Sequence, residues 1–271
     1  MIPGSRFQVP GSRVRGSQFR VPGSVALLVA ATLGAAPRVG QPQGEPDGTT
    51  ALHRAVHEDD ARQVDALIRA GSDVKAANRY GVTPLWLAAL GGNPAVLETL
   101  LKAGADPNTA TPEGESVLMV AARTGTLDAV KVLLARGAAV NAKESWRGQT
   151  PLMWAAVEGH ARVVSLLLEA GAEVSARSST GFTALLFAAR DGRLDVVRTL
   201  VSAGAPVDEA LPARRGRGGA PADGDSAVTG ADTGLTAFLL AAGNAHYELA
   251  SWLLDRGASP NAAPQGWTAL H

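Results

Sequence analysis

The stretch TPLWLAALGGNPAVLETLLKAGADPN, residues 83–108, contains every part of one structural unit. Thr83-Pro84 places a capping hydroxyl before a proline in the first turn of a helix, where a missing N–H costs nothing. Asn93-Pro94 repeats this start for a second helix. Gly104 suits the left-handed conformation that ends a helix, and polar turn residues follow it. The stretch therefore predicts two short helices and a hairpin-like turn.

Two series of glycines show that this unit recurs. The first series comprises Gly48, Gly81, Gly114, Gly148, Gly181, Gly234 and Gly266. The second comprises Gly71, Gly104, Gly137, Gly171, Gly204 and Gly257. Both are spaced by 33 or 34 residues up to the fifth unit and then by 53, so one insertion of 20 residues interrupts the repeat. Two short helices cannot bury an apolar face alone, but stacked units bury it between neighbours, which predicts an all-α solenoid.

We place six repeats and the start of a seventh by these glycines. Their bounds are 47–77, 78–110, 111–143, 144–177, 178–210, 234–263 and, in part, 264–271. The insertion at 211–233 is rich in Gly, Ala, Asp and Arg, and we expect a solvated, disordered loop. Its Arg214, Arg215 and Arg217 are candidates for steering an acidic partner.

Two motifs at fixed places in the units resemble those of the ankyrin repeat family. Variants of the family's Thr-Pro-Leu-His-x-Ala element occur at Thr50–Ala55, Thr83–Ala88, Ser116–Ala121, Thr150–Ala155, Thr183–Ala188 and Thr236–Ala241, with a shortened copy at Thr268–His271. Its Leu-Leu-x-x-Gly-Ala element occurs at Leu100–Ala105, Leu133–Ala138, Leu167–Ala172 and Leu253–Ala258. Only His53 and His271 keep the motif histidine, so we expect the other repeats to depend on packing instead. The resemblance implies a scaffold that binds a protein on its concave surface.

The N-terminal part of the sequence differs from the repeats. Residues 1–24 are of low complexity, and we interpret them as disordered or as the product of a start codon assigned too early. Residues 25–36, VALLVAATLGAA, match a signal-peptide core and cleavage site, and are too short to span a bilayer. Residues 37–46 form a linker. We therefore expect an extracytoplasmic protein, periplasmic or secreted and bacterial in character; if 25–36 is merely a buried or disordered stretch, the protein is cytoplasmic.

Motifs for catalysis and for cofactors do not occur in the sequence. There is no cysteine, no Gly-x-Ser-x-Gly elbow, no phosphate-binding loop and no His-Glu-x-x-His helix. His53 and His57 are four residues apart but lack a third metal ligand at a recognisable spacing. We therefore predict no enzyme, cofactor or metal site. Residues 37–271 carry 21 basic and 25 acidic residues, which argues against nucleic acid as a partner.

The candidate contact residues lie at the hairpin turns and on the exposed side of the first helix in each unit. They are Arg79, Tyr80, Glu113, Arg123, Trp146, Arg147, Glu158, Phe182 and Arg190. Trp146-Arg147 stands where the fourth repeat has one extra residue, which suggests a protruding anchor, because aromatic residues and arginine dominate interface hot spots. The alternative is that these rings pack across adjacent hairpins. Trp86 and Trp154 lie on first helices and are expected in the core.

The function predicted from these observations is a monomeric, non-catalytic scaffold for a protein partner. Two other functions remain open. The chain is also compatible with a regulatory or targeting arm of a larger enzyme that continues beyond residue 271, and with a secreted effector that acts on a host protein.

Overall fold

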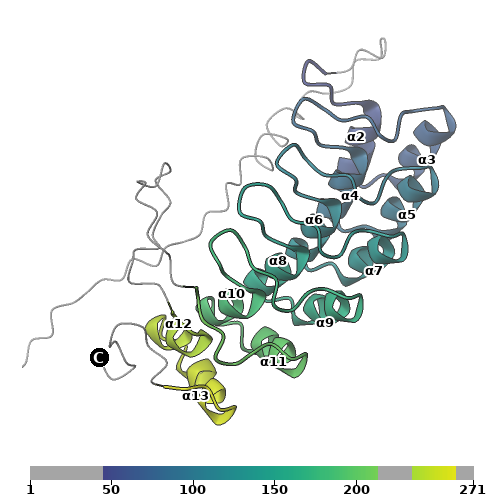
Figure 1. The fold of residues 1–271 in the computed structure, drawn as a ribbon. Coiled ribbons are helices and arrows are strands. Elements are labelled where there is room, and N and C mark those ends of the chain that lie inside the picture. Colours follow the sequence, from purple (N-terminus) through teal and green to yellow (C-terminus); the bar gives the residue numbers. More distant parts are fainter. Residues whose placement is uncertain (1–44, 213–233, 261–271) are drawn as a thin grey trace, which may run out of the picture. The chain divides into compact units, whose positions relative to one another are not determined.

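The computed structural model describes residues 45–212 and 234–260, all within one compact unit, 42–271 (Figure 1). The predicted signal segment, the start of the seventh repeat and the arginines of the insertion lie outside the described residues. Among the described residues, no helix combines the length and apolar character needed to cross a bilayer.

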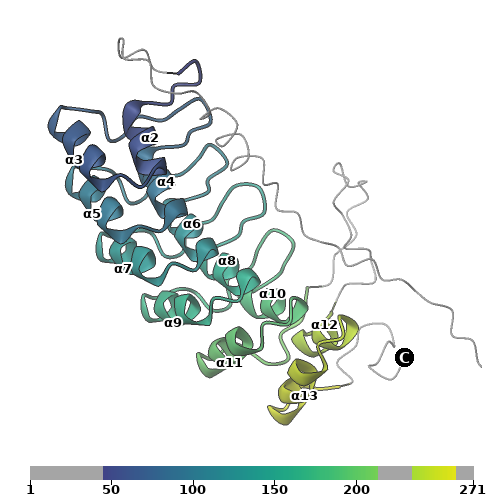
Figure 2. The ribbon, with the colours of Figure 1, turned by 180° about the vertical axis from the view of Figure 1, so that it is seen from behind.

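The described residues form six helix pairs, one in each repeat, which confirms the all-α prediction. The first, inner helices are α2 (Ala51–His57), α4 (Pro84–Gly91), α6 (Val117–Thr124), α8 (Pro151–Glu158), α10 (Ala184–Arg190) and α12 (Ala237–Gly243). The second, outer helices are α3 (Ala61–Arg69), α5 (Pro94–Lys102), α7 (Leu127–Ala135), α9 (Ala161–Glu169), α11 (Leu194–Ser202) and α13 (Tyr247–Asp255). Each inner helix packs against the next, and so do the outer helices from α3 to α11, in two rows (Figures 1 and 2).

The predicted helix caps determine where the inner helices begin. In α4, the hydroxyl of Thr83 accepts a hydrogen bond from the backbone N–H of Trp86, and Pro84 occupies the first turn. Thr50, Ser116, Thr150, Thr183 and Thr236 cap the other inner helices in the same way. Because each cap is local to its own turn, the start of each inner helix follows from the sequence directly.

The motif histidine makes its polar link in the first repeat. His53 Nε2 lies 3.0 Å from the carbonyl of Val82, and its Nδ1 lies 3.2 Å from the backbone N–H of Thr50. Burial lowers the pKa of His53, in keeping with a neutral ring. At the same position, Trp86 and Met119 are 1% and 0% exposed, and the indole N–H of Trp86 has no hydrogen-bond partner. Met119 keeps one contact, in which its Sδ accepts the backbone N–H of Ser116 at 3.4 Å. Neither side chain makes the link to the next repeat that His53 makes, so packing holds this position in the second and third repeats.

A second set of side chains links three outer helices, α9, α11 and α13, to the preceding repeat. The side chain of the residue just before the outer helix contacts a backbone carbonyl near the C-terminal end of the inner helix in the preceding repeat. These contacts join His160 to Arg123 at 2.9 Å, Arg193 to Val157 at 3.0 Å, and His246 to Arg190 at 3.1 Å. A carbonyl only accepts, so both histidines carry hydrogen on Nε2. His160 therefore has a structural role, since it joins the fourth repeat to the third.

The insertion replaces the tip of one hairpin. In the third repeat, Thr111 N donates to Glu115 O at 3.1 Å and Gly114 N donates to Thr111 O at 2.8 Å. Leu211, Gly234 and Leu235 repeat both bonds at 3.0 and 2.8 Å, so residues 212–233 correspond in sequence to Pro112-Glu113 of the third repeat. Leu211 is buried and belongs to the hairpin, and the Pro212 ring lies against Gly181 as the Pro112 ring lies against Gly81.

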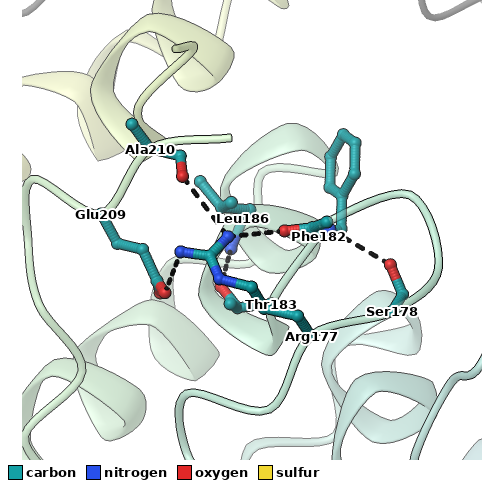
Figure 3. Close-up of polar contacts among 8 residues, drawn as sticks. Arg177, Ser178, Phe182, Thr183, Leu186, Glu209 and Ala210 are labelled. Carbon is teal, nitrogen blue, oxygen red and sulfur yellow. Dashed lines mark hydrogen bonds and ion pairs between the residues drawn. The ribbon is translucent and has the colours of Figure 1, made fainter. Parts of the chain in front are cut away.

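Arg177 fastens this hairpin to the fifth repeat (Figure 3). Its guanidinium donates to the backbone carbonyls of Gly181, at 2.7 Å, and Ala210, at 3.4 Å, and pairs with the Glu209 carboxylate at 2.8 Å. The Glu209 side chain is only 8% exposed. The stack therefore continues in register from α10 to α12 although 22 residues separate Leu211 from Gly234.

Candidate functional site

The tip of the fourth hairpin presents an exposed tryptophan on a firmly held backbone. The Trp146 side chain is 56% exposed. Beneath it, the buried carboxylate of Glu144 accepts the backbone N–H groups of Trp146 at 2.6 Å, Arg147 at 2.8 Å and Gln149 at 2.9 Å. Hydrogen bonds to a charged acceptor are stronger than neutral ones. The extra residue of this repeat therefore widens the tip without loosening it.

Backbone hydrogen bonds also tie this tip to the hairpins on either side. Ser145 donates from its backbone N–H and its hydroxyl to the carbonyl of Glu113, the former at 2.8 Å. Ser179 donates from the same two groups to the carbonyl of Arg147, at 2.7 and 2.9 Å. The Arg147 guanidinium lies 4.2 Å from the centroid of the Trp146 ring. Trp146 nevertheless remains 56% exposed, which disfavours the alternative that its ring is buried across adjacent hairpins.

A half-buried ion pair lies beside this tip. The Arg123 guanidinium is 3.3 Å from Glu115 and stacks on Trp154, 5.1 Å from the ring centroid. Burial raises the pKa of the Glu115 carboxyl above its ordinary value of 4.5; Arg123 opposes this, while the charges of Glu113 and Glu144 add to it. The net effect is that ionisation of Glu115 is less favourable in the folded protein than in the unfolded chain. Trp154, expected in the core, is only partly buried and carries a cation on its face.

The raised pKa has a consequence for stability. Glu115 contributes full stability below pH 4.5, and this contribution is lost as the pH rises through the higher pKa of the folded state. We therefore expect Glu115→Gln to raise the free energy of unfolding at pH 7, because the neutral amide avoids the cost of burying a charge. Arg123 tolerates the loss of its ion pair with Glu115, because its side chain is 22% exposed and still stacks on Trp154.

Urea unfolding of the wild type and Glu115→Gln at pH 4.5 and pH 7 measures this effect. The variant's advantage should shrink at the lower pH, where more of the wild-type carboxyl is protonated in the folded protein than at pH 7. A variant less stable than the wild type at pH 7 would show that the ion pair with Arg123 outweighs the burial of the carboxylate.

Phe182 does not belong to the exposed surface, which corrects the sequence prediction. It is 7% exposed and stacks on Phe187, with ring centroids 4.9 Å apart. Its backbone N–H donates to the hydroxyl of Ser178, which turns the residue inward (Figure 3). Arg190 covers both rings, 5.7 and 5.1 Å from their centroids, and pairs with Asp191 at 2.8 Å. The surface here is formed by a guanidinium, not by an aromatic ring.

The remaining candidates divide between two places. Arg79 is exposed at the second hairpin tip and lies 4.8 Å from the ring centroid of the partly buried Tyr80. Glu158 is at the far end of α8 from the tips, where it lines an open cavity of about 470 Å³ with Arg193 and Glu248. Glu158 is therefore separated from the hairpin tips by the length of a helix.

The hairpin tips of the second, third and fourth repeats form a continuous row. We call residues 79–80, 112–113 and 146–147 the tip row. Gly81 packs so closely against the Pro112 ring that an added Cβ would lie 2.3 Å from its Cδ. The hydrogen bonds between Ser145 and Glu113 connect the next pair of tips. Glu144, which positions the fourth tip, was absent from the predicted set.

Comparisons with known proteins agree with this architecture. The family model described as ankyrin repeats in three copies matches residues 23–111 and 118–210, and a single ankyrin repeat matches residues 233–262. The chain belongs to the ankyrin repeat family. Similar curated proteins include the Notch-regulated ankyrin repeat-containing proteins of Homo sapiens and Xenopus laevis, and protein A of that name in Danio rerio. Each is 38% identical over 52 residues, 19% of this chain.

This ankyrin repeat chain spans about half the length of the curated relatives it matches, 46% in each of these three. They are animal proteins and do not support the bacterial character expected from the sequence.

Proposed function

We propose that the protein is a non-catalytic scaffold that binds a protein partner through the tip row and the adjacent faces of the inner helices. The observation that carries this proposal is the exposed Trp146 ring on a backbone held by the Glu144 carboxylate. Aromatic residues are enriched in interface hot spots, and a rigid anchor loses little entropy on binding. Membership of a family built for protein–protein interaction supports the same function.

We further propose that the protein acts as a monomer outside the cytoplasm. This location depends on the signal-like sequence at 25–36, which lies outside the described residues. Cleavage is directly measurable by N-terminal sequencing of the protein purified from the medium or envelope of its source cells. An intact N-terminus on protein recovered only from the cytoplasm would refute this proposal.

Trp146→Ala tests the binding surface. We expect the substitution to weaken binding of the partner about 10- to 100-fold, as for truncation of a hot-spot aromatic. The melting temperature should change little, because the ring is 56% exposed. Tyr247→Ala is a matched control: Tyr247 is 71% exposed but lies on α13, away from the tips.

The full-length wild type and both variants serve as baits in extracts of the source organism, and captured proteins are quantified and then titrated against each bait. A partner retained by the wild type and Tyr247→Ala but lost by Trp146→Ala supports the proposed surface. A partner lost by Tyr247→Ala instead, or a large fall in the melting temperature of Trp146→Ala, contradicts it.

A further inference from the structure

Charges alternate along the tip row. Arg79 lies at the second hairpin tip, Glu113 at the third and Arg147 at the fourth. Arg79 and Glu113 are exposed, and among the described residues neither has an ion pair with another side chain. The row therefore presents the order positive, negative, positive to a molecule that crosses the stack.

Both arginines of the row are held in place by aromatic rings. Arg79 stacks on Tyr80 and Arg147 on Trp146, with the guanidinium carbon 4.8 and 4.2 Å from the ring centroids. The Arg79 guanidinium also donates one N–H to the Tyr80 hydroxyl. A guanidinium over an aromatic ring still presents N–H groups in the fork that matches a carboxylate. Stacking also removes rotamer freedom before binding, so less entropy is lost when a carboxylate arrives. These arginines are thus prepared to bind acids.

The spacing of the repeats limits the shape of the partner. Packed helices lie about 8–10 Å apart, so adjacent tips are separated by roughly 10 Å and Arg79 from Arg147 by roughly 20 Å. An extended chain advances about 3.3 Å per residue. The distance between adjacent tips therefore corresponds to about three residues of an extended segment, and the distance from Arg79 to Arg147 to about six residues.

We propose that the partner docks an extended segment along the tip row, with an acidic residue opposite Arg79, a basic residue about three positions on opposite Glu113, and a second acidic residue about six positions on opposite Arg147. An apolar residue next to the second acid contacts Trp146. This inference rests on the proposed function and specifies the chemistry of its partner. The reverse charge order would set like charges against all three positions of the row, which opposes binding.

Labelled synthetic peptides test the charge order directly. The first probe carries Glu, Lys and Glu at positions 1, 4 and 7 of a Ser/Thr-rich host, with Ile at position 8. In the second probe, positions 1, 4 and 7 carry the exchanged charges Lys, Glu and Lys. In the third probe, the two Glu residues of the first are placed at positions 1 and 4. Fluorescence polarisation with the full-length protein should show binding of the first probe at least ten times tighter than that of the other two, and weaker at high salt.

A charge exchange on the protein supplies the reciprocal test. Arg79→Glu/Glu113→Lys/Arg147→Glu should reverse the preference, so that the Lys, Glu, Lys peptide becomes the tighter ligand by about tenfold. The matched control is Arg62→Glu/Arg162→Glu, which changes two exposed arginines on the outer helices α3 and α9 and should leave the preference unchanged.

The outcomes separate this inference from the proposed function. Equal affinity for the first two probes, no binding of the first probe up to millimolar concentration, or no reversal in the exchanged variant overturns the inference. A partner that is captured through Trp146 but is indifferent to the charge exchange leaves the proposed function in place. A partner indifferent to both Trp146→Ala and the charge exchange overturns both proposals.

Discussion

Glu144→Ala is expected to lower the free energy of unfolding by about 2–4 kcal/mol. The Glu144 carboxylate is the acceptor for the backbone N–H groups of Trp146, Arg147 and Gln149, at 2.6–2.9 Å. Each hydrogen bond to a charged acceptor contributes roughly 1.5–3 kcal/mol, and water at the tip will replace part of this. Removal of the carboxylate also leaves a turn with one extra residue and nothing to fill it.

Urea unfolding followed by circular dichroism measures the loss. Glu113→Ala is the matched control, because Glu113 is an exposed carboxylate on the neighbouring tip and its substitution should change the free energy of unfolding by less than about 0.5 kcal/mol. Glu144→Gln should fall between the wild type and Glu144→Ala, since an amide oxygen still accepts but carries no charge. A loss below about 1 kcal/mol in Glu144→Ala would mean that water satisfies the tip as well as the carboxylate does.

The parts of the fold that follow from local chemistry were predictable from the sequence. Thr83 caps α4 through a bond three residues along the chain, and the positive φ of Gly104 follows a helix end. Such interactions require no knowledge of distant residues, and the period of the glycines adds that each unit meets a copy of itself. The number of described helices and their order in the stack follow from these two facts.

The exposure of Phe182 was not predictable with the same reasoning. It follows a turn glycine, as Val82, Glu115 and Gln149 do in their repeats. Val82 is fully buried, whereas the other two are partly exposed. The position after the turn glycine therefore does not determine on its own whether a side chain is buried or exposed. In the fifth repeat the outcome depends on Phe187, which offers a ring to stack on. The apolar Val82 was the one signal in the sequence that favoured burial.

The role of Glu144 depends on geometry that the sequence does not contain. An acidic residue at the start of a hairpin is ordinarily assigned to solvent. Only the width of a tip with one extra residue brings three N–H groups around one carboxylate. The same applies to Trp154, whose position on a first helix suggested the core, but whose ring lies partly exposed beneath Arg123. Binding surfaces of this fold are thus set by contacts between repeats, where a repeat pattern is least informative.

Leu118→Ala is expected to have a comparably large effect, a loss of about 2–5 kcal/mol in the free energy of unfolding. Leu118 is 1% exposed on α6, which packs against both α4 and α8, so the cavity left by truncation lies between repeats that cannot easily close over it. Leu254→Ala makes the same chemical change on α13 at a side chain that is 40% exposed, and should cost less than about 1 kcal/mol.

The position of Leu118 also predicts the form of the transition. In a solenoid each repeat contacts only its neighbours, so a weakened third repeat reduces the coupling between the first two repeats and the last three described ones. Hydrogen exchange should then show α2 to α5 losing protection at a lower urea concentration than α8 to α11, whereas the wild type loses both together. A single transition, displaced but still common to all the helices, would show that coupling across the stack survives the loss of one side chain. The tip row spans the second to fourth repeats, so the same cavity should also weaken partner binding without touching a contact residue.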